Sequence, residues 1–253
     1  MPTPKILVVD IETSPIVSYT WGLFDQNVGL NQIQSDWFVL SWAAKWVGES
    51  KVHYRDQRRT KPLGNDKTML RVLWYMLNEA DIVVTQNGKR FDTKKLNARF
   101  AIHGFEPPAP YRQIDTLVMA KKHFGFTSNK LEYMTDKLNV KYKKLKHSKF
   151  PGFDLWRECL AGNIQAWNEM EKYNKHDVLA TEELYLRLAP WGTGVNFRPY
   201  TGDDTCNCGS ARLQKRGYHY TTSGKYQRFQ CLDCGAWTKS GDNMLSKGLK
   251  KGY

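Results

Sequence analysis

Hydrophobic and polar residues alternate in short blocks over the first quarter of the chain. Apolar, β-branched runs bounded by Gly, Pro, Asn or Ser are typical of strands. On this pattern we expect strands at Lys5–Ile11, Ile16–Phe24, Trp37–Val47 and Lys51–Tyr54, with a turn at residues 48–50 between the last two.

After residue 60 the apolar positions recur with a helical period. Met69, Leu70, Leu73 and Leu77 lie three and four positions apart within Asp66–Glu79, so they share one face of a predicted helix. The same reasoning predicts helices at Thr93–Ile102, Leu131–Leu138, Asp154–Ala161 and Ile164–Leu188, and strands at Ile82–Thr85 and ending at residues 114–116.

The order of these elements predicts the fold class. Strands in succession, then alternating helices and strands, then helices are typical of an α/β fold with a mixed sheet flanked by helices. We expect this unit to span residues 1–190, with Asp115 capping the helix that follows it. Residues 191–203 are rich in Gly, Pro, Thr and Asn and predict a linker to a small module at residues 204–253.

Composition favours a polyanionic partner. The chain has 38 Lys and Arg against 25 Asp and Glu, a net charge of +13, and 41% hydrophobic residues. Contact of cations with phosphates releases condensed counterions, although a net charge also serves solubility alone. No run approaches the ~20 apolar residues of a membrane span or resembles a signal-peptide core, so we expect a cytoplasmic protein without membrane contact.

The first candidate for chemistry follows the first predicted strand. Asp10 and Glu12 are two residues apart, so both carboxylates project from the same face at the end of an apolar run. Like charges in such a setting repel and resist ionisation, and a divalent cation between them removes that penalty. An Asp-x-Glu pair after a strand is also common without any metal.

Two further acidic positions follow later elements. Asp92 lies between a predicted strand and a helix, where an aspartate also serves as a cap, and Gly88 permits close approach of the backbone to a substrate. Tyr173 and Asp177 are four residues apart, so they share one face of a predicted helix. A Tyr–Asp hydrogen bond on a solvated helix is the alternative reason for this pair. His176 lies elsewhere on that helix and is expected to be structural.

In order, these residues resemble the three exonuclease motifs of the ribonuclease H-like DEDD superfamily, which includes polymerase proofreading domains. The superfamily's His branch has histidine where this chain has Lys172, so the chain resembles the Tyr branch. Flanking sequence also resembles phage-encoded exonucleases of this group, which implies the host cytoplasm as the location. The motifs are Asp10-x-Glu12, Asn87-x-x-x-Phe91-Asp92 and Tyr173-x-x-x-Asp177, within about residues 5–190.

The resemblance implies a metal-dependent 3′–5′ exonuclease acting on a single-stranded 3′ end. Asp10, Glu12 and Asp177 would hold the ion that activates water, and Asp10 with Asp92 the ion that stabilises the leaving oxygen. Carboxylate oxygens suit two Mg²⁺ or Mn²⁺ ions. Tyr173 would orient the water. The residues implied to bind the terminal nucleotide are Thr13, Asn87 and Phe91.

Four of the five cysteines lie in the last fifty residues. Cys231-x-x-Cys234-Gly has the form of a zinc knuckle, in which backbone N–H groups reach the first thiolate. Cys206-x-Cys208 is one residue shorter than the usual knuckle. The remaining one, Cys159, falls in a predicted helix and is expected to be a small core residue.

Two predicted strands, Gly217–Thr222 and Tyr226–Gln230, lie between the cysteine pairs, and the whole order resembles a zinc ribbon. We therefore expect one structural Zn²⁺ held by four thiolates. A reversible disulfide is the main alternative, and His219 is an alternative ligand. The expected ligands are Cys206, Cys208, Cys231 and Cys234.

Positive charge is concentrated in this module. Residues 198–253 hold ten Lys and Arg against four Asp and Glu, with aromatic residues between them. Such a mixture suits single-stranded nucleic acid, although the aromatic residues also serve as a core or contact a protein. A second basic stretch, Lys141–Phe150, predicts either a solvated loop or a phosphate-contacting edge.

The expected partners are therefore single-stranded DNA, with RNA as the alternative, and a replication or repair protein. Two other functions remain open at this point. One is a ribonuclease H-like structure-specific endonuclease, which would use the same metals. The other is a non-catalytic zinc-ribbon protein that binds nucleic acid.

Overall fold

The computed structural model of the chain describes residues 4–142, 149–192, 195–201 and 204–245. The basic stretch predicted at residues 141–150 falls largely on residues 143–148, which lie outside the described ranges. Within the described ranges, no helix combines the length and the apolarity that crossing a membrane requires.

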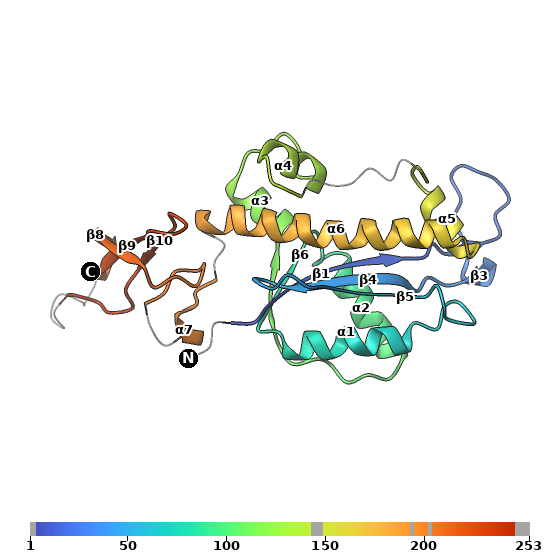
Figure 1. Ribbon diagram of the computed structural model, residues 1–253, viewed down its shortest axis with the longest axis horizontal. Coiled ribbons are helices and arrows are strands. Elements are labelled where there is room, and N and C mark those ends of the chain that lie inside the picture. Colours follow the sequence, from blue (N-terminus) through green and yellow to red (C-terminus); the bar gives the residue numbers. More distant parts are fainter. Residues whose placement is uncertain (1–3, 143–148, 193–194, 202–203, 246–253) are drawn as a thin grey trace.

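A five-stranded mixed sheet forms the centre of the larger unit, in the order β5–β4–β1–β6–β7 (Figure 1). β1 (Ile6–Thr13) lies in the middle, antiparallel to β4 (Val39–Trp46) and parallel to β6 (Ile82–Thr85). β5 (Val52–Asp56) extends the antiparallel side and β7 (Arg112–Asp115) extends the parallel side. The predicted α/β fold with a mixed sheet is confirmed.

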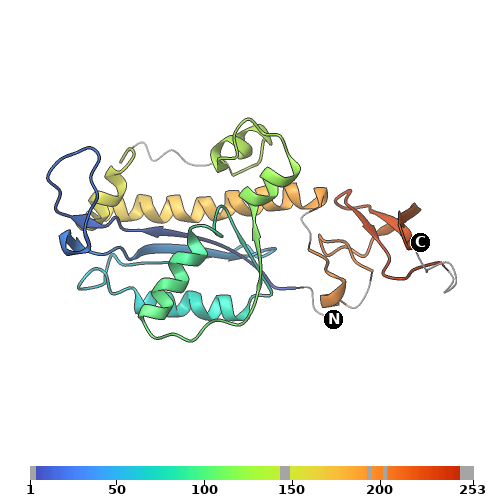
Figure 2. The ribbon, with the colours of Figure 1, turned by 180° about the vertical axis from the view of Figure 1, so that it is seen from behind.

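Helices cover both faces of the sheet, with α6 along one face and α1 and α2 on the other (Figures 1 and 2). Asp115 accepts hydrogen bonds from the N–H groups of Leu117 (3.0 Å) and Val118 (3.4 Å), so its predicted role as a helix cap is confirmed. The helices are α1 (Lys67–Glu79), α2 (Asp92–Ile102), α3 (Thr116–His123), α4 (Leu131–Lys137), α5 (Asp154–Leu160) and α6 (Ile164–Leu188).

The alternation of side chains along β1 divides the core into two layers. Leu7, Val9 and Ile11 pack with α1 and α2, whereas Ile6 and Val8 pack with α3, α4 and α6. Every second residue of a strand points to the same side. The residues that continue the Ile6–Val8 series, at positions 10 and 12, therefore face α6.

The predicted strand at Ile16–Phe24 is wrong. Only Val17–Ser18 (β2) is a strand, paired with β3 (Ile33–Ser35) in a separate two-stranded ribbon. Trp21 is 99% exposed and Leu23 91% exposed, so the apolar residues of this segment do not enter the core. Strand-forming side chains require a neighbouring strand and a core to cover them, and this segment has neither beyond its two-residue pairing.

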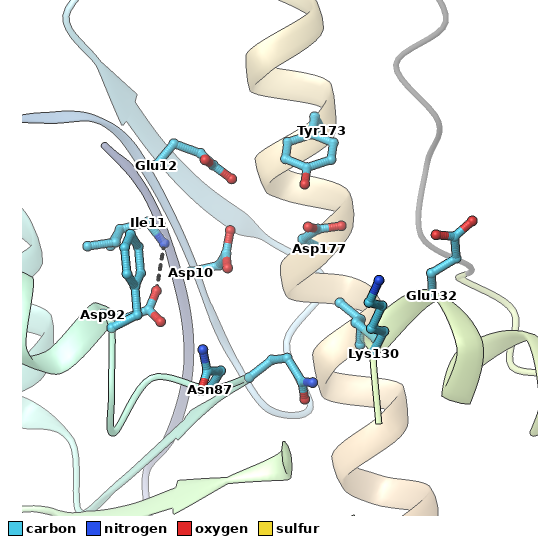
Figure 3. A pocket seen from close by; sticks show the side chains of 12 residues that line it. Asp10, Ile11, Glu12, Asn87, Asp92, Lys130, Glu132, Tyr173 and Asp177 are labelled. Atoms are coloured by element: carbon cyan, nitrogen blue, oxygen red, sulfur yellow. Dashed lines mark hydrogen bonds between the residues drawn. The ribbon is translucent and has the colours of Figure 1, made fainter. Parts of the chain in front are cut away.

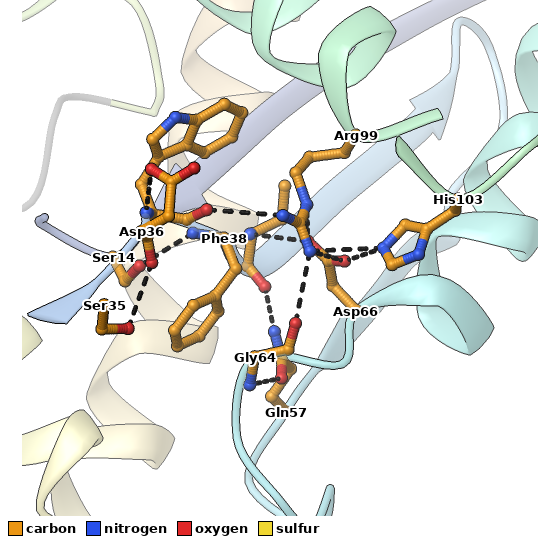
Figure 4. Close-up of polar contacts among 11 residues, drawn as sticks. Ser14, Ser35, Asp36, Phe38, Gln57, Gly64, Asp66, Arg99 and His103 are labelled. Atoms are coloured by element: carbon orange, nitrogen blue, oxygen red, sulfur yellow. Dashed lines mark hydrogen bonds and ion pairs between the residues drawn. The ribbon is translucent and has the colours of Figure 1, made fainter. Parts of the chain in front are cut away.

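A buried polar cluster fixes the start of α1 (Figure 4). Asp66, expected as the first helical residue, instead precedes the helix, and its carboxylate makes no capping hydrogen bond there. It is fully buried and accepts hydrogen bonds from Arg99 (2.6 and 2.8 Å), from the N–H of Val39 (2.9 Å) and from His103. Asp66 thereby connects α1, the end of α2 and the start of β4.

The C-terminal module is a three-stranded antiparallel sheet in the order β10–β9–β8. β8 (Leu213–Thr221) and β9 (Gly224–Cys231) form the predicted hairpin, which is confirmed with longer strands. β10 (Trp237–Lys239) was not predicted, because three residues are too few to show a period. The module lies beyond the C-terminal end of α6 (Figure 1).

The segment between the two units packs against the larger one. Within residues 191–203, Val195 and Phe197 are buried in the same core cluster as Leu188, and α7 occupies Arg198–Thr201. A narrow apolar cavity next to this segment is lined by residues of both units, including Tyr185, Phe197, Cys208 and Cys234. The cysteine module therefore rests on the core of the larger unit.

Candidate active site

The C-terminal end of β1 carries two carboxylates on the side that faces α6. Asp10 and Glu12 are both half-buried, and Ile11 between them points to the opposite core. The side-chain amide of Asn174 donates a hydrogen bond of 2.6 Å to Asp10 Oδ2. Asp10 and Glu12 therefore project from the same side of β1, as strand alternation predicts, and this side faces α6.

Asp92 is not a helix cap. Phe91 occupies the capping position of α2, and the Asp92 side chain makes no capping hydrogen bond. Its carboxylate is 3% exposed and accepts the backbone N–H of Ile11 at 3.1 Å, which ties it to β1. Burial raises the pKa of Asp92 to about 7, and the nearby Asp115 charge adds to this, while backbone N–H donors oppose it.

α6 contributes the remaining acid and the tyrosine. Tyr173 and Asp177 are four residues apart on the same helix face, and both are buried. Burial raises the pKa of Tyr173 above its usual range, and the neighbouring carboxylates, Asp177 foremost, raise it further. The phenol therefore stays protonated and serves as a hydrogen-bond donor. In Figure 3 its hydroxyl points toward Asp177.

These side chains meet around one cavity of about 340 Å³ (Figure 3). Thr13 is half-buried further along β1 and does not belong to the lining. Lys130 is the only Lys or Arg of the lining, among residues that the structure describes. The predicted site residues that line the cavity are Asp10, Glu12, Asn87, Phe91, Asp92, Tyr173 and Asp177.

The loop that carries Asn87 is held from behind by Asp115. The two Asp115 carboxylate oxygens accept the N–H groups of Asn87 (2.9 Å) and Lys89 (3.1 Å). A Cβ on Gly88 would lie 2.3 Å from the Thr85 hydroxyl oxygen. Contact with Thr85 therefore requires glycine at position 88, whether or not a substrate approaches the backbone there.

Sequence reasoning missed four polar residues that shape the cavity, among them Glu132 of α4, whose carboxylate belongs to the lining. Asn174 is fully buried and orients Asp10, but its position next to Tyr173 in the sequence gives no sign of this role. Gln86 and Lys130 line the cavity from the end of β6 and the start of α4. Neither residue is part of a hydrophobic repeat or of a motif with fixed spacing, so only the packing of distant elements shows that they line the cavity.

The four cysteines of the C-terminal module converge on one point. One donor atom from each lies within 4.8 Å of the others, and this is the only such group of potential metal ligands among the described residues. The Cys206–Cys234 and Cys208–Cys231 sulfur pairs are 3.4 and 3.7 Å apart. Tetrahedral Zn²⁺ with Zn–S bonds of ~2.3 Å holds its ligands ~3.8 Å apart, so the cluster fits zinc.

The alternatives to a four-thiolate site find no support. All four cysteines are free rather than joined in disulfides, and the ring of His219 lies beside Tyr226, outside the cluster. Burial opposes ionisation of Cys231, but hydrogen bonds from the N–H groups of Cys234 and Asp233 lower its pKa to about 7. This is the donation to the first thiolate expected of a knuckle, and the short Cys206–Cys208 spacing does not prevent convergence.

Cys159 does not belong to this site. It is fully buried in the cluster that α5 and α6 form with β4, so its predicted place in the core is confirmed. Burial raises the pKa of its thiol to about 12, which keeps the group uncharged and unreactive.

Fold and cavity together define a protein with a ribonuclease H-like nuclease fold. Residues 27–189 match the sequence profile of the RNase H superfamily, and the chain belongs to this superfamily. No curated protein sequence shows significant similarity to it.

Among solved structures, the family B DNA polymerase from the hyperthermophilic archaeon Pyrobaculum calidifontis has a similar fold, with a TM-score of 0.51 and 14% sequence identity. The similarity covers 75% of this chain and 26% of the polymerase, so the chain matches about a quarter of that protein. At this identity the likeness concerns the fold alone.

Proposed function

We propose that this protein is a metal-dependent 3′–5′ exonuclease that removes nucleotides from a single-stranded 3′ end. The observation that carries the proposal is that, besides Glu132 of α4, the four predicted carboxylates and Tyr173 converge on one cavity of a ribonuclease H-like fold. The carboxylates come from β1, α2 and α6, which are far apart in the sequence. The direction of hydrolysis rests on the resemblance of these motifs to the Tyr branch of the DEDD exonucleases.

The donor set fits divalent cations that prefer oxygen ligands. The cavity is lined by carboxylates and by neither thiolate nor imidazole, as Mg²⁺ and Mn²⁺ require. Without a cation, burial favours the protonated form of Asp92, and a bound cation favours the carboxylate. Asp10, Glu12 and Asp177 would hold one ion, and Asp10 with Asp92 the other. Two such ions, when bound, supply Lewis-acid activation of water and neutralise charge at the leaving oxygen.

The protein's own side chains position the substrate and the water. The neutral Tyr173 hydroxyl is suited to orient the attacking water rather than to remove its proton. Asn87 and the half-exposed Phe91 ring are suited to hold the terminal nucleotide, by hydrogen bonding and by stacking respectively. Lys130 carries a positive charge at the opposite wall, where it can contact a phosphate. We also propose that Thr13, which lies beyond the lining of the cavity, contacts the 3′ end through its backbone or its hydroxyl.

We also propose that residues 204–253 hold one structural Zn²⁺ through the four cysteines and contact the nucleic-acid substrate. The convergence of the thiolates supports the metal, and the excess of Lys and Arg supports the substrate contact. Residues 1–190 would then be the catalytic domain, with residues 191–203 joining the two.

The test is nucleotide release from 5′-labelled single-stranded DNA, double-stranded DNA and single-stranded RNA with Mg²⁺ or Mn²⁺. Wild type should shorten the single strand stepwise from its 3′ end. Asp10→Ala and Asp177→Ala should each slow release by about 1,000-fold, because several kcal/mol of transition-state stabilisation are removed.

The matched control is Glu106→Ala, which removes an exposed carboxylate outside the cavity and should leave the rate unchanged. Undiminished activity of both aspartate variants would exclude the proposed site. Internal cuts, rather than a ladder of products shortened from one end, would identify an endonuclease. The absence of any metal-dependent turnover would support a non-catalytic nucleic-acid-binding protein.

A further inference from the structure

One side of the C-terminal sheet presents aromatic and cationic side chains from all three strands. Tyr226 and Arg228 are two residues apart on β9, and Trp237 and Lys239 are two apart on β10, so each pair points to one side. Lys239 is the register partner of Arg228, and His219 of β8 is the partner of Tyr226. We call these five side chains the aromatic–cation face.

Within this face each cation lies against a ring of the neighbouring strand. Lys239 Nζ is 3.7 Å from the centroid of the Tyr226 ring, and Arg228 Cζ is 4.8 Å from that of Trp237. Trp237 is 52% exposed, and Arg228 and Lys239 are exposed as well. Each cation therefore covers one face of a ring, which leaves about half of Trp237 open to solvent, whereas Tyr226 is half-buried.

These aromatic residues are not the core of the module. The buried cluster of the module consists of Cys206, Cys231 and Ala236, with Leu213 and Cys234 against it. The opposite side of β9 carries Cys231, so that side turns toward the cysteine cluster. The aromatic–cation face has no such internal role.

The charge of the face is not neutralised internally. Over the described part of the module, neither Arg228 nor Lys239 forms an ion pair with a carboxylate, whereas Arg212 pairs with Asp233. Arg228 Nε instead donates to the carbonyl oxygen of Arg216 at 2.9 Å, which fixes the guanidinium without cancelling its charge. A polyanion is the partner that such a face complements.

We propose that the aromatic–cation face binds a single strand of nucleic acid, with unpaired bases stacked on Tyr226 and Trp237 and phosphates held by Arg228 and Lys239. Rings stack on bases only when these are unpaired, so a single strand is favoured over a duplex. The proposal rests on the nucleic-acid substrate proposed for the nuclease domain. It adds a second contact point beyond the end of α6, and that end itself lies roughly 16 Å along the helix from Asp177.

The measurement is the affinity of the full chain for an oligothymidylate of about 16 nucleotides, the upper end of single-strand site sizes in small folds. The background variant Asp177→Asn prevents digestion, and anisotropy is recorded over a range of salt concentrations. Tyr226→Ala with Trp237→Ala removes two stacking rings and should weaken binding by about 30-fold or more. Arg228→Gln with Lys239→Gln should reduce the slope of log affinity against log salt by about 1.4.

The matched control is the opposite side of the hairpin, where Tyr218 and Tyr220 are also exposed and lie near Lys225. Tyr218→Ala with Tyr220→Ala should change affinity by less than about 2-fold, because this pair lies outside the face. Unchanged binding in both face variants, or a loss confined to the control pair, overturns the proposal. Zinc content and melting temperature verify that each variant is folded. Should the Trp237 variant lose zinc, the exposed Arg228 and Lys239 pair still decides the outcome.

Failure of this proposal is distinguishable from failure of the proposed nuclease function. Release of a nucleotide from a trinucleotide by the otherwise unaltered chain tests the cavity alone, since so short a substrate does not reach the sheet. If the wild type is inactive but the face variants still weaken binding, the exonuclease is refuted and the nucleic-acid-binding face is supported. If the wild type is active but the face variants bind as tightly as it does, the exonuclease is supported and the binding face is refuted.

Discussion

Asn174 and Asp10 are joined by a hydrogen bond of 2.6 Å between a fully buried amide and the carboxylate that both proposed metal ions share. The same amide lies 3.3 Å from the Asp10 carbonyl oxygen, and its own oxygen accepts the Ser41 hydroxyl at 3.1 Å. Asp10 is therefore oriented from α6 and, through Asn174, from β4. A carboxylate held in this way needs no reorganisation when it binds a cation.

We predict that Asn174→Ala lowers activity by about 10-fold to 100-fold, as loss of a ligand-orienting partner does. The expected signature is a shift of the Mg²⁺ titration to higher concentration, because the orientation of Asp10 is lost while the ligand remains. Ser41→Ala, one hydrogen bond further away, should show a smaller shift in the same direction. An unchanged Mg²⁺ dependence in Asn174→Ala would refute the role assigned to this amide.

Lys130 gives a second prediction, because it is the one Lys or Arg that the described residues contribute to a cavity lined by several carboxylates. Lys130→Ala should raise KM for a single strand by about 10-fold to 100-fold, the loss of a charged hydrogen bond to phosphate. The Mg²⁺ titration should stay where it is, since no metal ligand is removed. Lys137→Ala on the same helix α4 is the matched control and should leave KM unaltered, because Lys137 does not line the cavity. Equal effects of the two substitutions would show that general surface charge is responsible.

The cysteine cluster predicts one zinc ion per chain by elemental analysis, lost in a variant with Cys231→Ser and Cys234→Ser. We expect this loss to lower the melting temperature of the whole chain, because Cys234 and Cys208 line the apolar cavity against Tyr185 of α6. Cys159→Ala is the control: its thiol lies in the other core, so zinc content should be retained. Zinc-free protein from a metal-replete preparation would exclude the site.

The Asp66 cluster predicts a large effect on stability far from the cavity. Asp66→Ala should reduce the free energy of unfolding by about 3–5 kcal/mol, because Arg99 is left buried without its partner. Urea denaturation measures the difference. Glu79→Ala breaks the ion pair with Lys5 and should cost far less, because both side chains are more than half exposed. Similar values for both variants would mean that the buried cluster contributes no more than a surface pair.

The failed strand prediction at residues 16–24 and the correct one at β1 have the same local pattern but different surroundings. β1 is flanked by β4 and β6, which satisfy its backbone groups and bury its side chains on both faces. Residues 19–24 have no such neighbours, and their aromatic and aliphatic side chains remain exposed. Burial against other elements, rather than side-chain type, decided the outcome.

What the sequence determined by itself is everything that depends on a short-range period. Alternation along a strand aligned Asp10 with Glu12, and the helical repeat aligned Tyr173 with Asp177. Spacing also predicted the hairpin between the cysteine pairs. These relationships hold because neighbouring residues of a regular element have a set geometry whatever they pack against.

Only the tertiary structure decided which distant groups meet. The carboxylate of Asp92, a candidate helix cap, is buried and accepts a hydrogen bond from β1. Asn174 donates a hydrogen bond to Asp10, and Lys130 lies in the cavity wall. The tertiary structure also showed that the aromatic residues of the module lie outside its core. Such contacts depend on how the faces of β1, α2, α4 and α6 pack together, and local periodicity carries no information about that packing.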